Sequence, residues 1–83
     1  MTKVIVYSQP TCAPCHAEKA WMREQGIAFE DRNIRDNAAW LRELIALGSQ
    51  GTPTTLIEAD GERQVIIGFD RARLSRALEL DHH

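Results

Sequence analysis

Two cysteines three positions apart, Cys12 and Cys15, constrain the fold of this sequence more than any other feature. They follow a β-branched run, Lys3 to Tyr7, that predicts a buried strand. On a helix, residues three apart share one face with Cβ atoms about 5–6 Å apart, whereas a disulfide needs Cβ atoms about 3.5–4.5 Å apart. A small adjustment at a helix start lets such a pair form and break a disulfide. We therefore expect a strand that leads into a helix beginning near Cys12.

The start of a helix favours one of the two thiols electrostatically. The first N–H groups of a helix lack intrahelical partners, and the positive end of the helix dipole stabilises an anion. Cys12 should therefore ionise more readily than Cys15. Pro14 suits this position, because a proline in the first turn loses no intrahelical hydrogen bond and has its φ angle already fixed.

Length, charge and cysteine content narrow the function classes. The 83 residues, 43% of them hydrophobic, suffice for a single domain over residues 1–83. The formal net charge of -2 predicts no nucleic-acid or anionic-membrane partner. We find no apolar run of about 20 residues and no signal sequence, and expect a cytoplasmic protein. In that reducing compartment, a CxxC pair indicates redox chemistry or metal binding rather than a structural disulfide.

The hydrophobic pattern predicts four strands and three helices in the order βαβαββα. After the first strand come a helix over 13–25, an edge-like strand over 27–34 and a helix over 37–47 capped by Asp36. Strands over 54–58 and 63–67 flank the Asp60-Gly61 turn of a hairpin. A last helix is capped by Asp70. The order places a parallel strand pair before an antiparallel hairpin.

Several side chains are assigned to the core or to the surface. His16 should be an exposed side chain, because a protonated imidazole opposes the dipole of a first helical turn. Glu30 and Asp31 are neighbours on a strand, so they point to opposite faces and cannot form an acid–base pair. The helix positions expected to face the core are Ala13, Ala17, Ala20 and Trp21, then Trp40, Leu41, Leu44 and Ile45, then Leu74, Ala77 and Leu78.

Three segments in this order resemble the thioredoxin fold, and within it the glutaredoxin family. They are Tyr7 to Cys15 with its CxxC pair, Thr52-Pro53 before the third strand, and Gly68-Phe69-Asp70 after the fourth. The resemblance covers essentially the whole chain and extends to the glutaredoxin-like redoxins that reduce ribonucleotide reductase. It implies an α/β fold with a four-stranded mixed sheet flanked by three helices, and a dithiol–disulfide oxidoreductase.

The resemblance also implies roles for individual residues. Cys12 matches the attacking cysteine and Cys15 the resolving cysteine, so the redox-active disulfide is Cys12–Cys15 and no cofactor or metal is bound. Pro53 matches the cis-proline that places the backbone of Thr52 beside the disulfide. The substrate-binding surface implied in this way comprises Gln9, Thr11, Pro14, Thr52, Pro53, Gly68, Phe69 and Asp70.

The expected partners are a disulfide-containing protein substrate and an electron donor, with the chain itself a monomer. Because the sequence has no glycine-rich dinucleotide motif, electrons must come from glutathione or from a flavoprotein such as thioredoxin reductase. Glutaredoxins usually have a lysine where this chain has Gln9, and an acidic residue where it has Arg71. These replacements favour thioredoxin reductase as the donor.

Other functions compete with redox turnover. The same fold can serve as a docking module whose dithiol holds a metal or an iron–sulfur cluster between two subunits. Structural zinc usually needs four ligands, and the remaining candidates are His16, His82 and His83. Cys12 to His16 also matches the pattern for c-type haem attachment, but that reaction would require export, and Met1 and Met22 are poor candidates for a distal ligand.

Overall fold

The computed structural model describes residues 2–79 and contains four strands and three helices in the predicted βαβαββα order. The elements are β1 (Thr2–Ser8), α1 (Ala13–Glu24), β2 (Glu30–Asn33), α2 (Ala38–Ala46), β3 (Thr54–Ala59), β4 (Glu62–Ile67) and α3 (Arg71–Ala77). Among the described residues, no helix combines the length and apolar character needed to cross a membrane.

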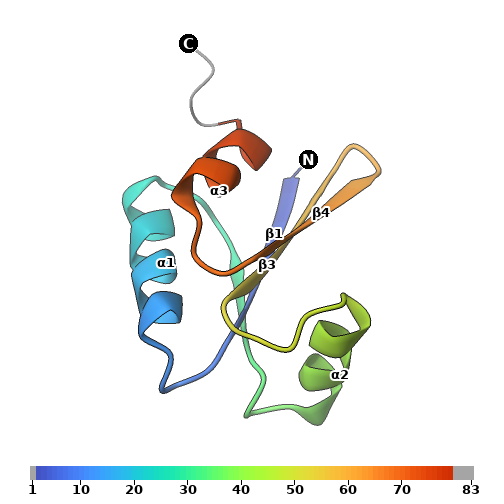
Figure 1. Ribbon diagram of the computed structural model, residues 1–83. Helices are drawn as coiled ribbons and strands as arrows, with labels where there is room; N and C mark the ends of the chain where they lie inside the picture. Colours follow the sequence, from blue (N-terminus) through green and yellow to red (C-terminus); the bar gives the residue numbers. More distant parts are fainter. Residues whose placement is uncertain (1, 80–83) are drawn as a thin grey trace.

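The strands form one mixed sheet with the order β2-β1-β3-β4. β1 pairs parallel to β2, with Ile5 opposite Glu30, and antiparallel to β3, with Val6 opposite Thr55. β3 and β4 form the expected hairpin, whose turn residues Asp60 and Gly61 have φ angles of 53° and 80°. In Figure 1, α1 and α3 lie on one side of the sheet and α2 lies on the other.

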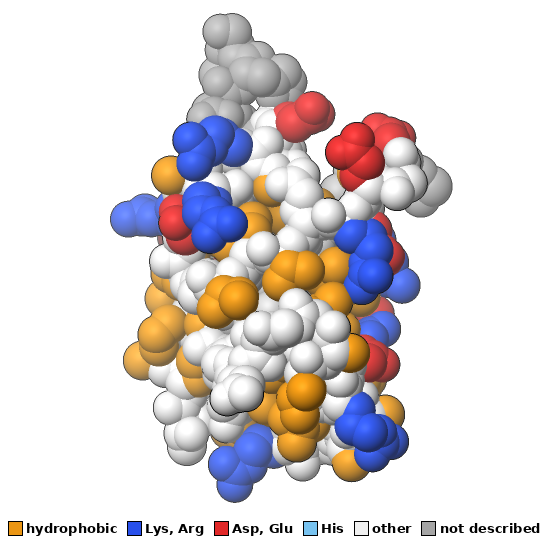
Figure 2. Space-filling model, turned by 45° about the vertical axis from the view of Figure 1, so that its right-hand side comes forward, with side chains coloured by type: hydrophobic (Ala, Val, Ile, Leu, Met, Phe, Trp, Pro, Cys, Tyr) orange, Lys and Arg blue, Asp and Glu red, His pale blue; other side chains and the backbone are white. Residues whose placement is uncertain are grey.

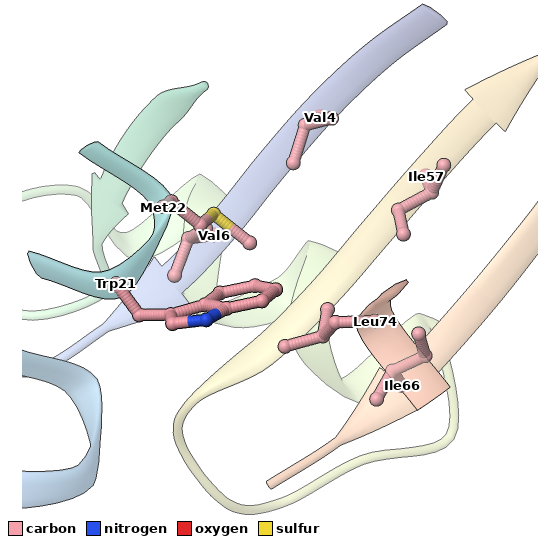
Figure 3. Packing of buried hydrophobic residues seen from close by; sticks show 7 residues of the cluster. All are labelled: Val4, Val6, Trp21, Met22, Ile57, Ile66 and Leu74. Atoms are coloured by element: carbon pink, nitrogen blue, oxygen red, sulfur yellow. The ribbon is translucent and has the colours of Figure 1, made fainter. Parts of the chain in front are cut away.

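The larger apolar core fills the space between the sheet and the helices α1 and α3. Figure 3 shows the Trp21 ring extending from α1 toward Leu74 of α3, with strand residues beside them. The buried residues of this core are Val4, Val6, Trp21, Met22, Ile57, Ile66 and Leu74. The partly buried Ala77 and Leu78 pack against them. The core positions predicted for Trp21 and for α3 are therefore confirmed.

The predicted apolar face of α1 is wrong in three of its four positions. Ala13, Ala17 and Ala20 are exposed, and the buried residues of the helix are Cys15, Glu18, Trp21 and Met22. The true inner face still follows the spacing of about 3.6 residues per turn. It was not recognised because one of its members is a glutamate and because alanine occurs on either face of a helix.

The predicted buried face of α2 is only partly correct. Leu44 is fully buried against Ile5, Tyr7 and Leu56, but Leu41 and Ile45 are 41% and 55% exposed. Successive helix residues are about 100° apart, so the predicted set spans a wider arc than the sheet covers. Trp40 is half-buried, not part of the core. Figure 2 shows hydrophobic side chains exposed among uncharged atoms on the face nearest α2 and the hairpin.

The start of the second strand and the cap of the second helix also differ from the prediction. The second strand begins at Glu30 and not at residue 27, because the Ile27 amide donates to the Met22 carbonyl and Phe29 packs on the core. Asn37, rather than Asp36, caps α2, since its Oδ1 accepts a hydrogen bond from the Ala39 amide at 2.8 Å. Asp70 caps α3 as predicted, accepting from the Arg73 amide at 3.1 Å.

Candidate active site

Cys12 and Cys15 form a disulfide at the start of α1, with their Cα atoms 5.2 Å apart. Cys12 is the N-cap residue, and its Sγ accepts a hydrogen bond from the Cys15 amide at 3.1 Å. Pro14 lies in the first turn, as predicted. A helix start supplies unpaired N–H groups and a positive potential, so the surroundings of Cys12 favour negative charge on its sulfur.

The two sulfurs differ in their access to solvent. Cys12 is half-buried, whereas Cys15 is completely buried against the sheet. Thr11 and Pro14 are both exposed on the outer side of the pair. A partner molecule can therefore reach Cys12 but not Cys15.

The loop before β3 lies directly beside the disulfide. The Thr52-Pro53 bond is cis, as the family resemblance implied, and the Thr52 carbonyl oxygen is 3.5 Å from the Cys12 sulfur. The Gln9 side-chain amide donates to the Thr52 hydroxyl at 3.1 Å. Gly68, whose φ angle is +86°, donates its amide to the Pro53 carbonyl at 2.8 Å. Three loops that are distant in sequence thus meet at Thr52 and Pro53, beside Cys12.

The remaining predicted site residues have structural contacts of their own. Phe69 packs on Trp21 with ring centroids 6.0 Å apart, and the Asp70 carboxylate is used as the cap of α3. Both nevertheless follow Gly68 and so lie in the loop next to Pro53. A buried hydrogen bond of 2.8 Å between the Ser49 and Thr54 hydroxyls joins the two ends of the loop that contains Pro53.

Asp31 ties the edge strand β2 to α1 and β1. Its carboxylate accepts hydrogen bonds from Ser8 and, in an ion pair of 2.8 Å, from Lys19. Burial opposes ionisation of this carboxyl, but the Lys19 and Ser8 contacts outweigh it and lower its pKa below the usual value. Glu30 accepts a hydrogen bond from Arg32 instead, so the two neighbouring carboxylates have different partners.

Glu18 is the site residue that our reading of the sequence missed. It lies one helical turn after Cys15, its side chain is completely buried, and its Oε2 accepts a hydrogen bond from the Thr55 hydroxyl. Its Oε1 has no hydrogen-bond partner. Burial raises the pKa of this carboxyl, and the Thr55 hydroxyl offsets part of the rise. A charged residue three positions after a cysteine, on its helix face, was the available signal.

The structure shows where the residues considered as metal or haem ligands lie. Within residues 2–79, no three His, Cys, Asp or Glu side chains gather in a way that could hold a metal ion. His16 is exposed, as predicted, and its Nε2 is 2.8 Å from the Pro10 carbonyl oxygen. Met22, the rejected haem ligand, is fully buried in the core. His82 and His83 lie outside the described residues.

This combination of sheet, helix-capping disulfide and adjacent cis-proline defines a thioredoxin-fold protein with the site of a thiol–disulfide oxidoreductase. A sequence model of the glutaredoxin family matches residues 4–62. The chain therefore belongs to the glutaredoxin family. Members of that family are thiol–disulfide oxidoreductases, and the chain has this function.

Individual relatives agree with this assignment. A glutaredoxin-like 8.6 kDa protein in a rubredoxin operon of Clostridium pasteurianum is 33% identical over 75 residues, which cover 89% of this chain and 95% of the relative. A variant of the thioredoxin-like protein BC3987 superposes with a TM-score of 0.80 at 34% identity, covering 98% of this chain and 100% of the other. The NrdH-redoxin of Escherichia coli has a TM-score of 0.77 at 26% identity, with coverages of 89% and 92%.

Proposed function

We propose that the protein reduces protein disulfides by using Cys12 as the nucleophile and Cys15 as the resolving thiol. The observation that carries this assignment is the difference between the two sulfurs. Cys12 is accessible, caps α1 and lies beside the Thr52 carbonyl, whereas Cys15 is completely buried. Attack on a large substrate must therefore begin at Cys12.

The proposed reaction has two exchange steps. The Cys12 thiolate attacks one sulfur of the substrate disulfide, and the other substrate sulfur leaves with the electron pair. The Cys15 thiolate then attacks Cys12 Sγ, which releases the second substrate sulfur and forms the Cys12–Cys15 bond. Because the second attack is intramolecular, it benefits from a high effective concentration.

We infer that a thioredoxin-reductase-like flavoprotein supplies the electrons. Glutathione carries carboxylates, for which a cation is a stronger partner than a neutral amide. Gln9 offers only an amide, and that amide is already bound to Thr52. The Asp70 carboxylate, which would face the glutathione amine, is used to cap α3. The E. coli NrdH-redoxin, described as having a thioredoxin-like activity profile, supports this preference by analogy.

The likeness to NrdH-redoxin also suggests a substrate. We propose ribonucleotide reductase, which the redoxins that this chain resembles reduce, as one protein that this chain serves. The proposal further assigns the chain to the reducing cytoplasm as a monomer, since two cysteines in a CxxC pair suit a reducing compartment. Electrons would then pass from the flavoprotein through Cys12 and Cys15 to the protein substrate.

Two coupled assays test the function and the electron source together. NADPH loss is followed with a protein disulfide as substrate, once with thioredoxin reductase and once with glutathione plus glutathione reductase. We expect turnover mainly in the first system, abolished by Cys12→Ser. Gln9→Lys should raise activity in the glutathione system. Strong turnover with glutathione alone, unchanged by Gln9→Lys, would contradict the proposed donor.

The cluster-binding alternative has its own measurement. An iron–sulfur cluster bound by the dithiol absorbs visible light, whereas a free dithiol or a disulfide does not. The visible spectrum of the protein purified without oxygen is therefore compared with that of Cys12→Ser. A visible band that disappears in the variant would favour the docking module over redox turnover.

A further inference from the structure

Glu18 is a buried carboxyl that has no role in the two exchange steps described above. Taking a carboxylate out of water is costly unless it is paired with a cation or fully hydrogen-bonded. Glu18 is completely buried, yet among the described residues its carboxyl accepts a hydrogen bond from Thr55 alone. Its Oε1 is the one buried polar side-chain atom without a partner among the described residues. Glutamine or an apolar residue would fill this space at lower cost.

The helix geometry directs this carboxyl toward Cys15. Residues three apart on a helix are neighbours on one face, with Cβ atoms about 5–6 Å apart. Helical side chains also lean toward the N-terminus and cover the preceding turn. Glu18 therefore covers the turn that contains Cys15, and both side chains are completely buried between α1 and the sheet.

Within residues 2–79, no charged side chain forms a hydrogen bond or an ion pair with Glu18. Thr55 is paired with Val6 of β1 and Ile66 of β4, and both of these residues belong to the core between the sheet and the helices α1 and α3. The nearest ion pair on α1, Lys19–Asp31, is directed to β2. Tyr7 and Glu43 bind each other on the opposite face, and Asp70 on the α3 side caps its own helix. Thr55 therefore binds the Glu18 carboxyl from the strand side, and Cys15 precedes Glu18 by one turn on the buried face of α1.

We propose that Glu18 is the proton acceptor for the Cys15 thiol in the resolving step. Given the proposed function, Cys15 must lose a proton to become a nucleophile, and bulk water does not reach it. The Glu18 carboxylate takes that proton, directly or through one water, and becomes a carboxylic acid. The Cys15 thiolate then attacks Cys12 Sγ, the bond from Cys12 to substrate sulfur breaks, and the substrate leaves with the electron pair. When the disulfide is reduced again, Glu18 returns the proton to Cys15.

The chemistry of a buried carboxyl suits this task. A general base works best when its pKa lies near the working pH. Burial raises the pKa of Glu18 toward that range, while the Thr55 hydroxyl prevents the carboxylate from being disfavoured further. The unpartnered Oε1 is the oxygen that remains free to accept the proton.

Dithiobis(nitrobenzoate), a disulfide that releases a coloured thiol, separates the two steps in a single turnover. Mixed with the fully reduced protein, it releases one coloured thiol when Cys12 attacks and a second when Cys15 resolves the mixed disulfide. Rates of both phases are measured by stopped flow from pH 5 to pH 10 for the wild type, Glu18→Gln and Glu24→Gln. Glu24 is exposed on the same helix and provides the matched control.

We expect Glu18→Gln to leave the first phase unchanged and to slow the second about 100-fold at pH 7, the lower end of general-base contributions. The rate of the second phase rises with pH, and the pH at which it is half-maximal is its midpoint. In Glu18→Gln this midpoint should move to higher pH, where the Cys15 thiol ionises by itself. Thr55→Val should move the midpoint less far in the same direction, because it keeps the carboxyl and removes the hydrogen bond that favours its charged form.

The outcomes distinguish the proposal from the function on which it rests. If Glu18→Gln keeps the midpoint of the wild-type second phase, Glu18 is not the proton acceptor. If both phases slow together with unchanged midpoints, its role is only structural, and the proposal is wrong. If the wild type itself shows no second phase, the assignment of Cys15 as resolving thiol fails instead.

Discussion

At the scale of single residues, the disulfide combines two cysteines with very different surroundings. Cys12 is a half-buried helix cap, and Cys15 is sealed between α1 and the sheet. The chemistry of the pair therefore depends as much on access as on ionisation. In the reaction that we propose, this asymmetry sets the order of the two steps, because the substrate disulfide reacts first with Cys12 and is released when Cys15 attacks.

This asymmetry predicts the order of alkylation. When the reduced protein is treated with iodoacetamide at neutral pH, we expect Cys12 to be modified first, because it is accessible and lies at the positive end of a helix. Cys15 should react only once the protein is unfolded in urea, which serves as the control. Peptide mass spectrometry identifies the modified residue. Earlier modification of Cys15 in the folded protein would reverse the assigned roles.

Some residues of the site could be predicted from the sequence and others could not, for physical reasons. Cys12 and Cys15 were recognisable because their spacing has a meaning for both helices and disulfides. The cis bond before Pro53 came from family resemblance, since a Thr-Pro dipeptide is usually trans. Glu18 was overlooked because a glutamate in a surface helix is usually exposed, and only the fold shows that its side of α1 faces Thr55.

At the scale of secondary-structure elements, α2 contributes less to the core than its composition suggests. Leu44 and Ile45 are adjacent and similar in size, but one is completely buried and the other is 55% exposed. A helix on one side of a small sheet can bury only the stripe that faces it. The exposed part of α2 belongs to the surface seen in Figure 2.

The two neighbours give a matched pair of substitutions. Leu44→Ala should lower the free energy of unfolding by about 2–5 kcal/mol, because it removes buried methyl groups and leaves a cavity. Ile45→Ala should change it by about 0.5 kcal/mol or less, as is usual for surface positions. Urea unfolding followed by circular dichroism measures both. Equal losses in the two variants would mean that the exposed side of α2 is covered in solution.

Strand β2 has only four residues and lies at the sheet edge, so its attachment depends strongly on side chains. Asp31→Asn removes the ion pair with Lys19 and weakens the bond from Ser8. We expect a loss of about 1 kcal/mol at pH 7, typical of a hydrogen-bonded pair that is partly exposed. Asp36→Asn, at an exposed position of the following turn, is the control.

The pH dependence of this loss has a definite sign. The pKa of Asp31 is lowered in the folded protein, so its ionised form stabilises the fold above the unfolded pKa of about 3.9. That stabilisation disappears as the pH falls through the lower folded pKa. The difference between the wild type and Asp31→Asn should therefore shrink below about pH 3.9. A difference that stays constant with pH would show that the carboxylate charge is not responsible.

The elements differed in how well the sequence predicted them. The hairpin was clear, because Asp60 and Gly61 are residues that adopt the positive φ angles of a tight turn. The strand at 27–34 was predicted too long because Ile27 and Phe29 are apolar enough for a strand, although they pack on the core instead. Pattern alone cannot tell a strand residue from a loop residue that is buried by tertiary contacts.

At the scale of the whole molecule, two carboxyls, one partly exposed and one completely buried, have opposite effects on stability. Asp31 holds β2 against α1, and its ionised form stabilises the protein. Glu18 is buried one helical turn after Cys15, and its ionised form destabilises the protein. A small domain has only about 5–15 kcal/mol of stability in total. A group that costs stability at neutral pH therefore implies a compensating use, which here is proton transfer at Cys15.

The last prediction follows from the raised pKa of Glu18. In the unfolded chain this carboxyl ionises near pH 4.3, but burial delays ionisation in the folded state. Between the two pKa values the folded state binds more protons, so stability falls as the pH rises through the folded pKa. The free energy of unfolding of the oxidised wild type should therefore decline relative to Glu18→Gln as the pH rises above about 4.3, by about 1.4 kcal/mol for each unit of the pKa difference. Urea unfolding at a series of pH values measures this, with Glu24→Gln as a control that should follow the wild type. A constant difference between Glu18→Gln and wild type would mean that Glu18 ionises alike in both states, and it could not then be the tuned proton acceptor.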